Sequence, residues 1–174
     1  LKEWVEPILL AVILALIIRT FFFQAFKIPT GSMRPTLIES DRILVNKILY
    51  RFKEPQRGDI VVFRYPGDGK RDFIKRLVGL PGDIVEIREG KILIGGKAVP
   101  ENSMLRKFYY YNREDWDFGG EGQKIEVPKD SYFVLGDNSS QSSDSRNWGF
   151  VPKKNMIGKA FMIYWPIKRV RLVE

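Results

Sequence analysis

Two residues could together carry acyl-transfer chemistry in this sequence, a serine at position 32 and a lysine at position 75. Ser32 lies in Pro29–Pro35, where two prolines and a glycine favour a rigid turn that presents its hydroxyl group. A serine hydroxyl becomes a strong nucleophile only when a neighbouring base removes its proton. The alternative for Ser32 is an ordinary turn hydrogen bond, which is the common use of a Gly-Ser pair in a loop.

Lys75 has the surroundings that such a base needs. It lies in Asp72–Val78, where strand alternation puts it on the same face as Phe73 and Leu77. Removal from water lowers the pKa of an ammonium group from its usual ~10.4 toward neutrality, where the amine can accept a hydroxyl proton. A lysine that extends to solvent or pairs with a carboxylate remains the alternative at this point.

The residues that are absent narrow the chemistry further. The 174 residues include no cysteine and no histidine. This excludes disulfides, thiolate nucleophiles, a Ser-His-Asp triad, and metal sites built on cysteine or histidine. We therefore expect neither a metal nor a cofactor, and lysine is the candidate base.

A third polar segment, Gly136–Gly149, follows an apolar strand-like run. Serine-rich sequence is typical of linkers. Here, however, aspartate, asparagine, arginine and tryptophan are interleaved with the serines between two predicted strands. This pattern favours an ordered, hydrogen-bonded loop that could orient a lysine base.

The N-terminal segment is predicted to be a membrane anchor. Trp4–Phe26 could form a helix of about 23 residues, long enough for a hydrocarbon core of roughly 30 Å. It lacks the basic leader and small-x-small site of a cleaved signal, and Ile8–Ile18 is apolar on all faces, unlike an in-plane helix. A buried core helix remains an alternative. We predict one uncleaved anchor over residues 1–25, whose orientation the flanking charges do not fix.

The remainder, residues 26–174, is predicted to be a mainly β domain, either a partly closed barrel or packed antiparallel sheets. Short β-branched and aromatic runs alternate with turn sequences, Glu89-Gly90 suits a tight hairpin, and no long helical period occurs after Phe26. Residues 100–124 are predicted to be a variable surface insertion. The predicted strands are Arg42–Lys47, Asp59–Tyr65, Asp72–Gly79, Asp83–Arg88, Lys91–Ile94, Ser131–Leu135 and Gly158–Trp165.

Four segments in order resemble the conserved boxes of the bacterial type I signal peptidases, which are Ser-Lys dyad proteases. Gly31–Leu37 (GSMRPTL) is similar to the nucleophile box, and Lys75–Asp83 (KRLVGLPGD) to the box with the base. Arg57–Phe63 (RGDIVVF) resembles a structural strand box. Gly136–Pro152, which contains DSR at 144–146 and WGFVP at 148–152, resembles the last box. The likeness extends from Phe26 to about Lys159, apart from residues 100–124.

This resemblance implies a role for each matching residue. Ser32 would attack the scissile carbonyl, and Lys75 would take its proton. The Ser32 backbone N–H and the Thr30 hydroxyl would form the oxyanion hole. Ser142 would orient the lysine amine. Asp144 and Arg146 would form a supporting ion pair, with Asp137 close to it.

The resemblance also implies a specificity. Phe26, Ile28, Leu37 and Ile74 would line shallow pockets for small side chains at positions −1 and −3 of the substrate. There are two departures from the family pattern. Thr30 stands where serine is common, and Ser139 stands where arginine is frequent.

The expected function is a single-pass plasma-membrane endopeptidase that cleaves signal peptides from secretory preproteins on the extracytoplasmic side. Its partners would be preproteins and the lipid bilayer, not nucleic acid. The net charge of +8 could favour nucleic acid, but the basic residues are scattered along the sequence. The rivals are a membrane-tethered β-barrel binding module, and a self-cleaving Ser-Lys repressor, which would need a DNA-reading helical domain.

Overall fold

The computed structural model describes residues 2–173 and begins with one long helix, α1 (Lys2–Phe21). The predicted helix over Trp4–Phe26 is too long at its C-terminal end. After Phe21 the chain enters strand β1 (Phe23–Lys27), which pairs antiparallel with β2 (Arg42–Asn46). The aromatic side chains of Phe23 and Phe26 favour a strand, and the hydrogen bonds to β2 stabilise this strand in place of a further turn of helix.

Among residues 2–173, no helix combines the length and the apolar character required to cross a bilayer.

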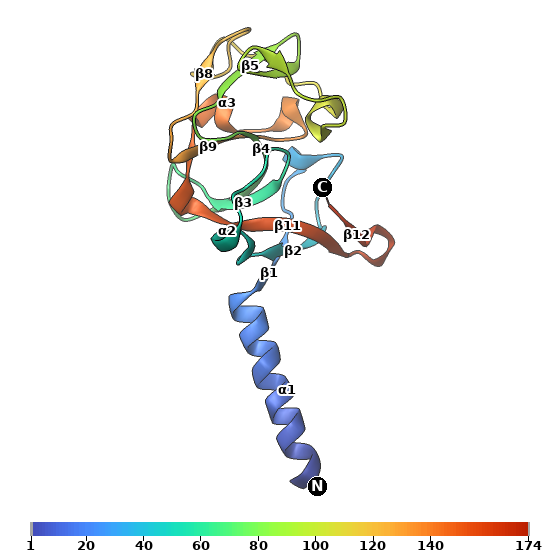
Figure 1. The fold of residues 1–174 in the computed structure, drawn as a ribbon. Coiled ribbons are helices and arrows are strands. Elements are labelled where there is room, and N and C mark those ends of the chain that lie inside the picture. The colour runs from blue at the N-terminus through green and yellow to red at the C-terminus, as the bar shows by residue number, and fades with distance from the viewer. Residues whose placement is uncertain (1, 174) are drawn as a thin grey trace.

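The larger of two sheets carries β1 at one edge and runs through the middle of the molecule (Figure 1). All its strand pairs are antiparallel, and the sheet is curled. Its order is β1, β2, β11 (Met156–Trp165), β3 (Ile60–Arg64), β4 (Asp72–Gly79), β9 (Ser131–Leu135) and β10 (Val151–Pro152), and β12 (Arg171–Leu172) pairs with β11.

The second sheet lies at the end of the molecule farthest from α1 (Figure 1). Its order is β7 (Lys97–Ala98), β6 (Lys91–Ile94), β5 (Ile84–Arg88) and β8 (Ile125–Glu126). The β5–β6 hairpin turns at Glu89 and Gly90, as predicted. Both residues have positive φ, 50° and 71°, which is the conformation of the tightest hairpin turns.

The prediction of a mainly β body made of packed antiparallel sheets is confirmed. All seven predicted strands are present, with ends within two residues of those expected. The sequence pattern missed β1 and the two-residue strands β7, β8, β10 and β12. It also missed two single-turn helices, α2 (Leu49–Phe52) and α3 (Ser145–Trp148), which are too short to show a helical period.

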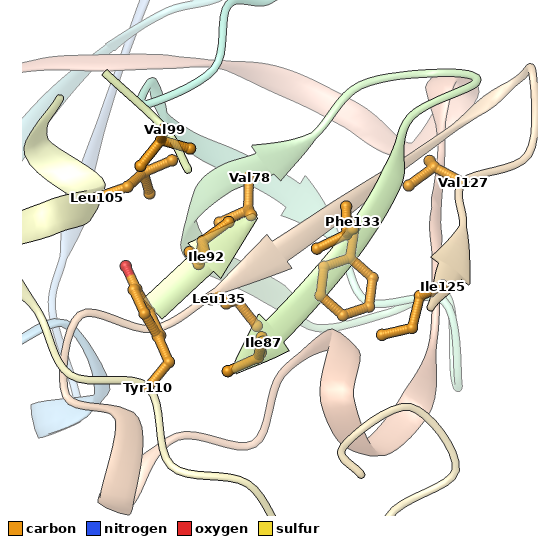
Figure 2. Packing of buried hydrophobic residues seen from close by; sticks show 11 residues of the cluster. Val78, Ile87, Ile92, Val99, Leu105, Tyr110, Ile125, Val127, Phe133 and Leu135 are labelled. Carbon is orange, nitrogen blue, oxygen red and sulfur yellow. The ribbon is translucent and has the colours of Figure 1, made fainter. Parts of the chain in front are cut away.

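Apolar residues from both sheets meet in one core (Figure 2). Val78, Phe133 and Leu135 from the large sheet pack against Ile87 and Ile92 from the small one. Two further clusters cover the two faces of the large sheet. One contains Ile28, Met33 and Leu37, and the other contains Val61, Phe63 and Leu77. These cores fix the strand that carries Lys75 and the loop that carries Ser32.

Residues 100–124 contain no strand, and they pack on the second sheet through a few side chains. The segment has one 3-10 turn, Met104–Lys107. Leu105 and Tyr110 are buried in the inter-sheet core, whereas Tyr109 and Tyr111 are exposed (Figure 2). The segment is therefore anchored by two buried side chains and presents two tyrosines to solvent.

Candidate active site

Ser32 lies in a 3-10 turn, Gly31–Met33, and hydrogen bonds hold this turn from both sides. Within the loop, the Leu37 backbone N–H donates to the Met33 carbonyl at 2.9 Å. From the serine-rich loop, the Asn138 backbone N–H donates to the Ser32 carbonyl at 3.0 Å. The Met33 side chain is completely buried beneath the turn. The backbone around the serine is therefore fixed before any substrate arrives.

The structure brings the Lys75 amine directly to the Ser32 hydroxyl. Lys75 is on β4, and its Nζ lies 2.8 Å from Ser32 Oγ. It also lies 3.1 Å from the Ile74 carbonyl oxygen and 5.6 Å from the centre of the Phe73 ring. Lys75 is 5% exposed and Ser32 is 7% exposed. The two predicted residues, 43 positions apart in the sequence, form one buried pair.

Burial lowers the pKa of Lys75 from an ordinary value of 10.5 to about 8. Loss of water around the ammonium is the main cause. The nearby carboxylates of Asp144 and Asp137 act in the opposite direction, and Arg146 offsets part of their effect. A substantial fraction of the amine is consequently neutral near pH 8. A neutral amine at hydrogen-bond distance can accept the proton of the serine hydroxyl.

The predicted Asp144–Arg146 ion pair is present and fully buried. Arg146 Nε and Nη2 each donate to one carboxylate oxygen at 2.8 Å, which is the bidentate geometry. Arg146 also donates to the Ser139 hydroxyl and to the Tyr111 carbonyl. Asp144 in turn accepts from the Gly136 backbone N–H at 3.0 Å. The pair therefore links the serine-rich loop to residues 100–124.

Asp137 was expected near that pair, but its side chain accepts hydrogen bonds from Arg76 and Thr36 instead. Arg76 Nε and Nη2 donate to its two carboxylate oxygens, each at 2.7 Å, and the Thr36 hydroxyl donates at 2.5 Å. The side chains of Arg76 and Asp137 are completely buried. Sequence reasoning gave neither Arg76 nor Thr36 a role. The available signal was an arginine next to Lys75 on a strand with apolar neighbours.

Gly136 is a position where only glycine fits, and sequence reasoning also missed it. A Cβ at this position would lie 2.2 Å from Ser142 Oγ and 2.6 Å from the Ser32 carbonyl oxygen. The start of the serine-rich loop, directly after β9, thus passes against the nucleophile turn. Ser142 is buried, but its hydroxyl has no hydrogen-bond partner within residues 2–173, Lys75 included. Its expected role in orienting the lysine stays a prediction.

The other predicted site residues differ in how far they are exposed. Thr30 is exposed beside the turn in an extended conformation, and its side chain does not cap that turn. Ile28 and Leu37 are buried in the core below the site, and Phe26 and Ile74 pack on this core with part of their surface exposed. Phe26 and Ile74 are thus open to contact from outside, whereas Ile28 and Leu37 are not.

The arrangement suits nucleophilic acyl transfer with a lysine base. In residues 2–173, no three acidic side chains are gathered as metal ligands would be. The site offers a buried hydroxyl, an adjacent amine with a lowered pKa, and two ion pairs that hold the surrounding loops.

Comparison with known proteins matches this sequence to one family. Residues 1–165 match the family described as "Signal peptidase, peptidase S26". The chain is 43% identical to a signal peptidase I from Leptolyngbya laminosa, over 98% of this chain and 82% of that protein. It is 38% identical to signal peptidase I P of Bacillus subtilis subsp. natto, over 97% and 91% of the two chains. A solved signal peptidase I from Enterococcus faecalis aligns with a TM-score of 0.49 and 35% identity, over 62% of this chain and 97% of that one.

We expect Gly136→Ala to destabilise the protein by about 1 to 3 kcal/mol, because the added methyl group forces the start of the serine-rich loop away from the Ser32 turn. The measurement is thermal denaturation of both proteins in detergent. Gly120→Ala is the matched control, since its Cβ would come no closer than 3.4 Å to any neighbour and would meet only the side chains of Gln123 and Glu114. Equal stability of Gly136→Ala and Gly120→Ala would contradict the close packing described here.

We expect Lys75→Met to be more stable than the wild type at pH 7, with a melting temperature several degrees higher. Below pH 8, Lys75 is charged in both the folded and unfolded states, and its burial opposes folding. Because the folded pKa is the lower one, this penalty disappears as the pH rises from about 8 to 10.5. The difference in melting temperature should shrink over that range. Lys97→Met, at an exposed lysine, should show no such trend.

Proposed function

Because the chain belongs to the signal peptidase family, peptidase S26, we propose that it is a serine endopeptidase that removes signal peptides from exported preproteins. We further propose Ser32 as the nucleophile and Lys75 as the general base. One observation carries the assignment of these roles, the 2.8 Å approach of the Lys75 amine to the Ser32 hydroxyl in a buried site.

In the first half of the reaction, the neutral Lys75 amine accepts the Ser32 hydroxyl proton as Oγ attacks the scissile carbonyl carbon. The carbonyl oxygen becomes an oxyanion, which the Ser32 backbone N–H and the Thr30 hydroxyl stabilise, each donor contributing about 3 kcal/mol in sites of this type. The Lys75 ammonium then donates its proton to the leaving amine. The C–N bond breaks, the mature protein leaves, and the signal peptide stays attached to Ser32 as an ester.

In the second half, water attacks that ester. Lys75, neutral again, accepts a proton from the water, and the oxyanion forms a second time. When the intermediate collapses, the Ser32 oxygen is the leaving group and recovers a proton from Lys75. The enzyme returns to its starting state with the signal peptide released as a carboxylate.

The cleavage site has small side chains at positions −1 and −3 in this proposal. Ile28 and Leu37 would form the floor of shallow pockets, and Phe26 and Ile74 their rims. A floor that is already filled by core packing leaves little depth for a side chain. Large residues at −1 or −3 would therefore be rejected by steric overlap.

We also propose that α1 is a single membrane anchor, with the catalytic domain on the extracytoplasmic side of the plasma membrane. The support is that α1 stands apart from the β domain (Figure 1) and exposes apolar side chains such as Leu9, Val12 and Leu16. Its 20 residues are about 30 Å long, but α1 does not combine this length with the apolar character of a bilayer-crossing helix, so the proposal rests on its exposed apolar side chains. Such an anchor would place Ser32 near the bilayer, where the apolar segment of a signal peptide lies.

We expect Ser32→Ala and Lys75→Ala each to lower cleavage of a preprotein in detergent micelles by at least a thousandfold, since each removes one partner of the proton transfer. The measurement is mass spectrometry of the products, with one cut after a small-x-small site by the wild type alone. Circular dichroism of both variants controls for folding.

Cleavage that persists in folded Lys75→Ala would contradict the assignment of the base. Absence of cleavage by the folded wild type would instead favour a binding module without protease activity.

A further inference from the structure

A cavity of about 530 Å³ is bordered by residues of the large sheet and of α2. Gln24 at the start of β1, Arg51 on α2 and Asp72 at the start of β4 form parts of its wall. The cavity therefore lies where several strands of the large sheet begin or end. It shares no lining residue with the Ser32 turn or with Lys75.

The cavity carries a surplus of positive charge. Its charged lining groups are four cations and two anions, namely Lys47, Arg51, Arg64, Lys153, Glu54 and Asp72. Arg64 pairs with Asp72 at 2.8 Å, and Lys153 pairs with Glu54 at 3.3 Å. The Arg51 guanidinium makes no hydrogen bond or ion pair with any residue in the range 2–173. Its five donors are available to a ligand.

The cavity also lies at the end of the helix. The Lys47 backbone N–H donates to the carbonyl of Phe22, the residue directly after α1, at 3.0 Å. Figure 1 shows α2 on the side of the β domain that faces α1. Phe52, the last residue of α2, is 82% exposed. A positively charged cavity thus has an exposed aromatic ring as its neighbour.

We propose that this cavity binds the phosphate group of an anionic phospholipid head group. The proposal rests on the proposed anchoring of α1, which would put the cavity at head-group height. A guanidinium group matches the geometry of phosphate oxygens, and a cationic surface attracts anionic lipids. Phe52 would enter the boundary between head groups and acyl chains, as aromatic residues of interfacial segments do. Free inorganic phosphate presents the same oxygens to the cavity, so the test must distinguish binding of a lipid phosphate from binding of free phosphate.

The test is a titration of the full-length protein in neutral detergent with dihexanoyl phosphatidylglycerol, a short-chain anionic lipid that does not require α1 to be inserted in a bilayer. We expect Arg51→Gln to weaken binding about fivefold, the effect of one cation near a phosphate. Lys97→Gln is the matched control, because Lys97 is an exposed lysine on β7 in the second sheet. It should leave the affinity unchanged. Dihexanoyl phosphatidylcholine should bind more weakly than the anionic lipid.

Three results would overturn the proposal. The first is that Arg51→Gln binds the anionic lipid as tightly as the wild type does, and the second is that Lys97→Gln loses as much lipid affinity as Arg51→Gln. The third is that inorganic phosphate binds as tightly as the lipid. The last would assign the cavity to free phosphate. Preprotein cleavage is measured in the same samples, and Arg51→Gln should cleave normally in detergent. If the wild type failed to cleave the preprotein, that result would contradict the proposed function but not the lipid site, because lipid binding is measured independently of cleavage.

Discussion

The whole site depends on keeping one amine out of water. An ammonium group resists burial, and the structure nevertheless places Lys75 in a site where it is 5% exposed. Its two nearby carboxylates would restore a high pKa if they were unpaired. Each has its own arginine instead, Arg76 for Asp137 and Arg146 for Asp144, in fully buried bidentate pairs. Arg146 offsets part of the effect of the two carboxylates, and loss of water remains the largest influence on the pKa of Lys75.

The same ion pairs position the nucleophile. Thr36, four residues after Ser32, donates to Asp137, and Asn138 donates to the Ser32 carbonyl. The serine-rich loop therefore fixes both the electrostatics around the lysine and the backbone of the serine. Gly136 allows that loop to approach the Ser32 turn closely. Three segments that are distant in sequence thus act as one unit. The inter-sheet core contains Val78 of β4 and Leu135 of β9, so it holds the strands that carry Lys75 and lead into the serine-rich loop (Figure 2).

Local alternation was enough to predict seven of the strands. Residue types marked Ser32 and Lys75 as candidates, and the resemblance to a family of Ser-Lys proteases joined them into one site. These signals did not reveal where α1 ends, because the aromatic residues after Phe21 fit a helix or a strand equally well until β2 supplies hydrogen bonds. They also did not reveal Arg76 or Gly136, whose importance lies in contacts with residues about 60 and 100 positions away. Basic residues scattered in the sequence, such as Arg51 and Lys153, line one cavity only after folding. Such properties depend on tertiary packing, which a local pattern does not encode.

The titration of the Lys75 amine itself tests the central claim most directly. Carbon NMR of protein labelled at the lysine Cε atoms would follow each lysine with pH, and the Lys75→Met variant would identify the Lys75 signal. The account predicts that this one signal titrates near pH 8, well below the ordinary value of 10.5 for a lysine amine. A Lys75 signal that titrates near the ordinary value of 10.5 would show that the amine stays charged at neutral pH. That result would contradict its role as the base.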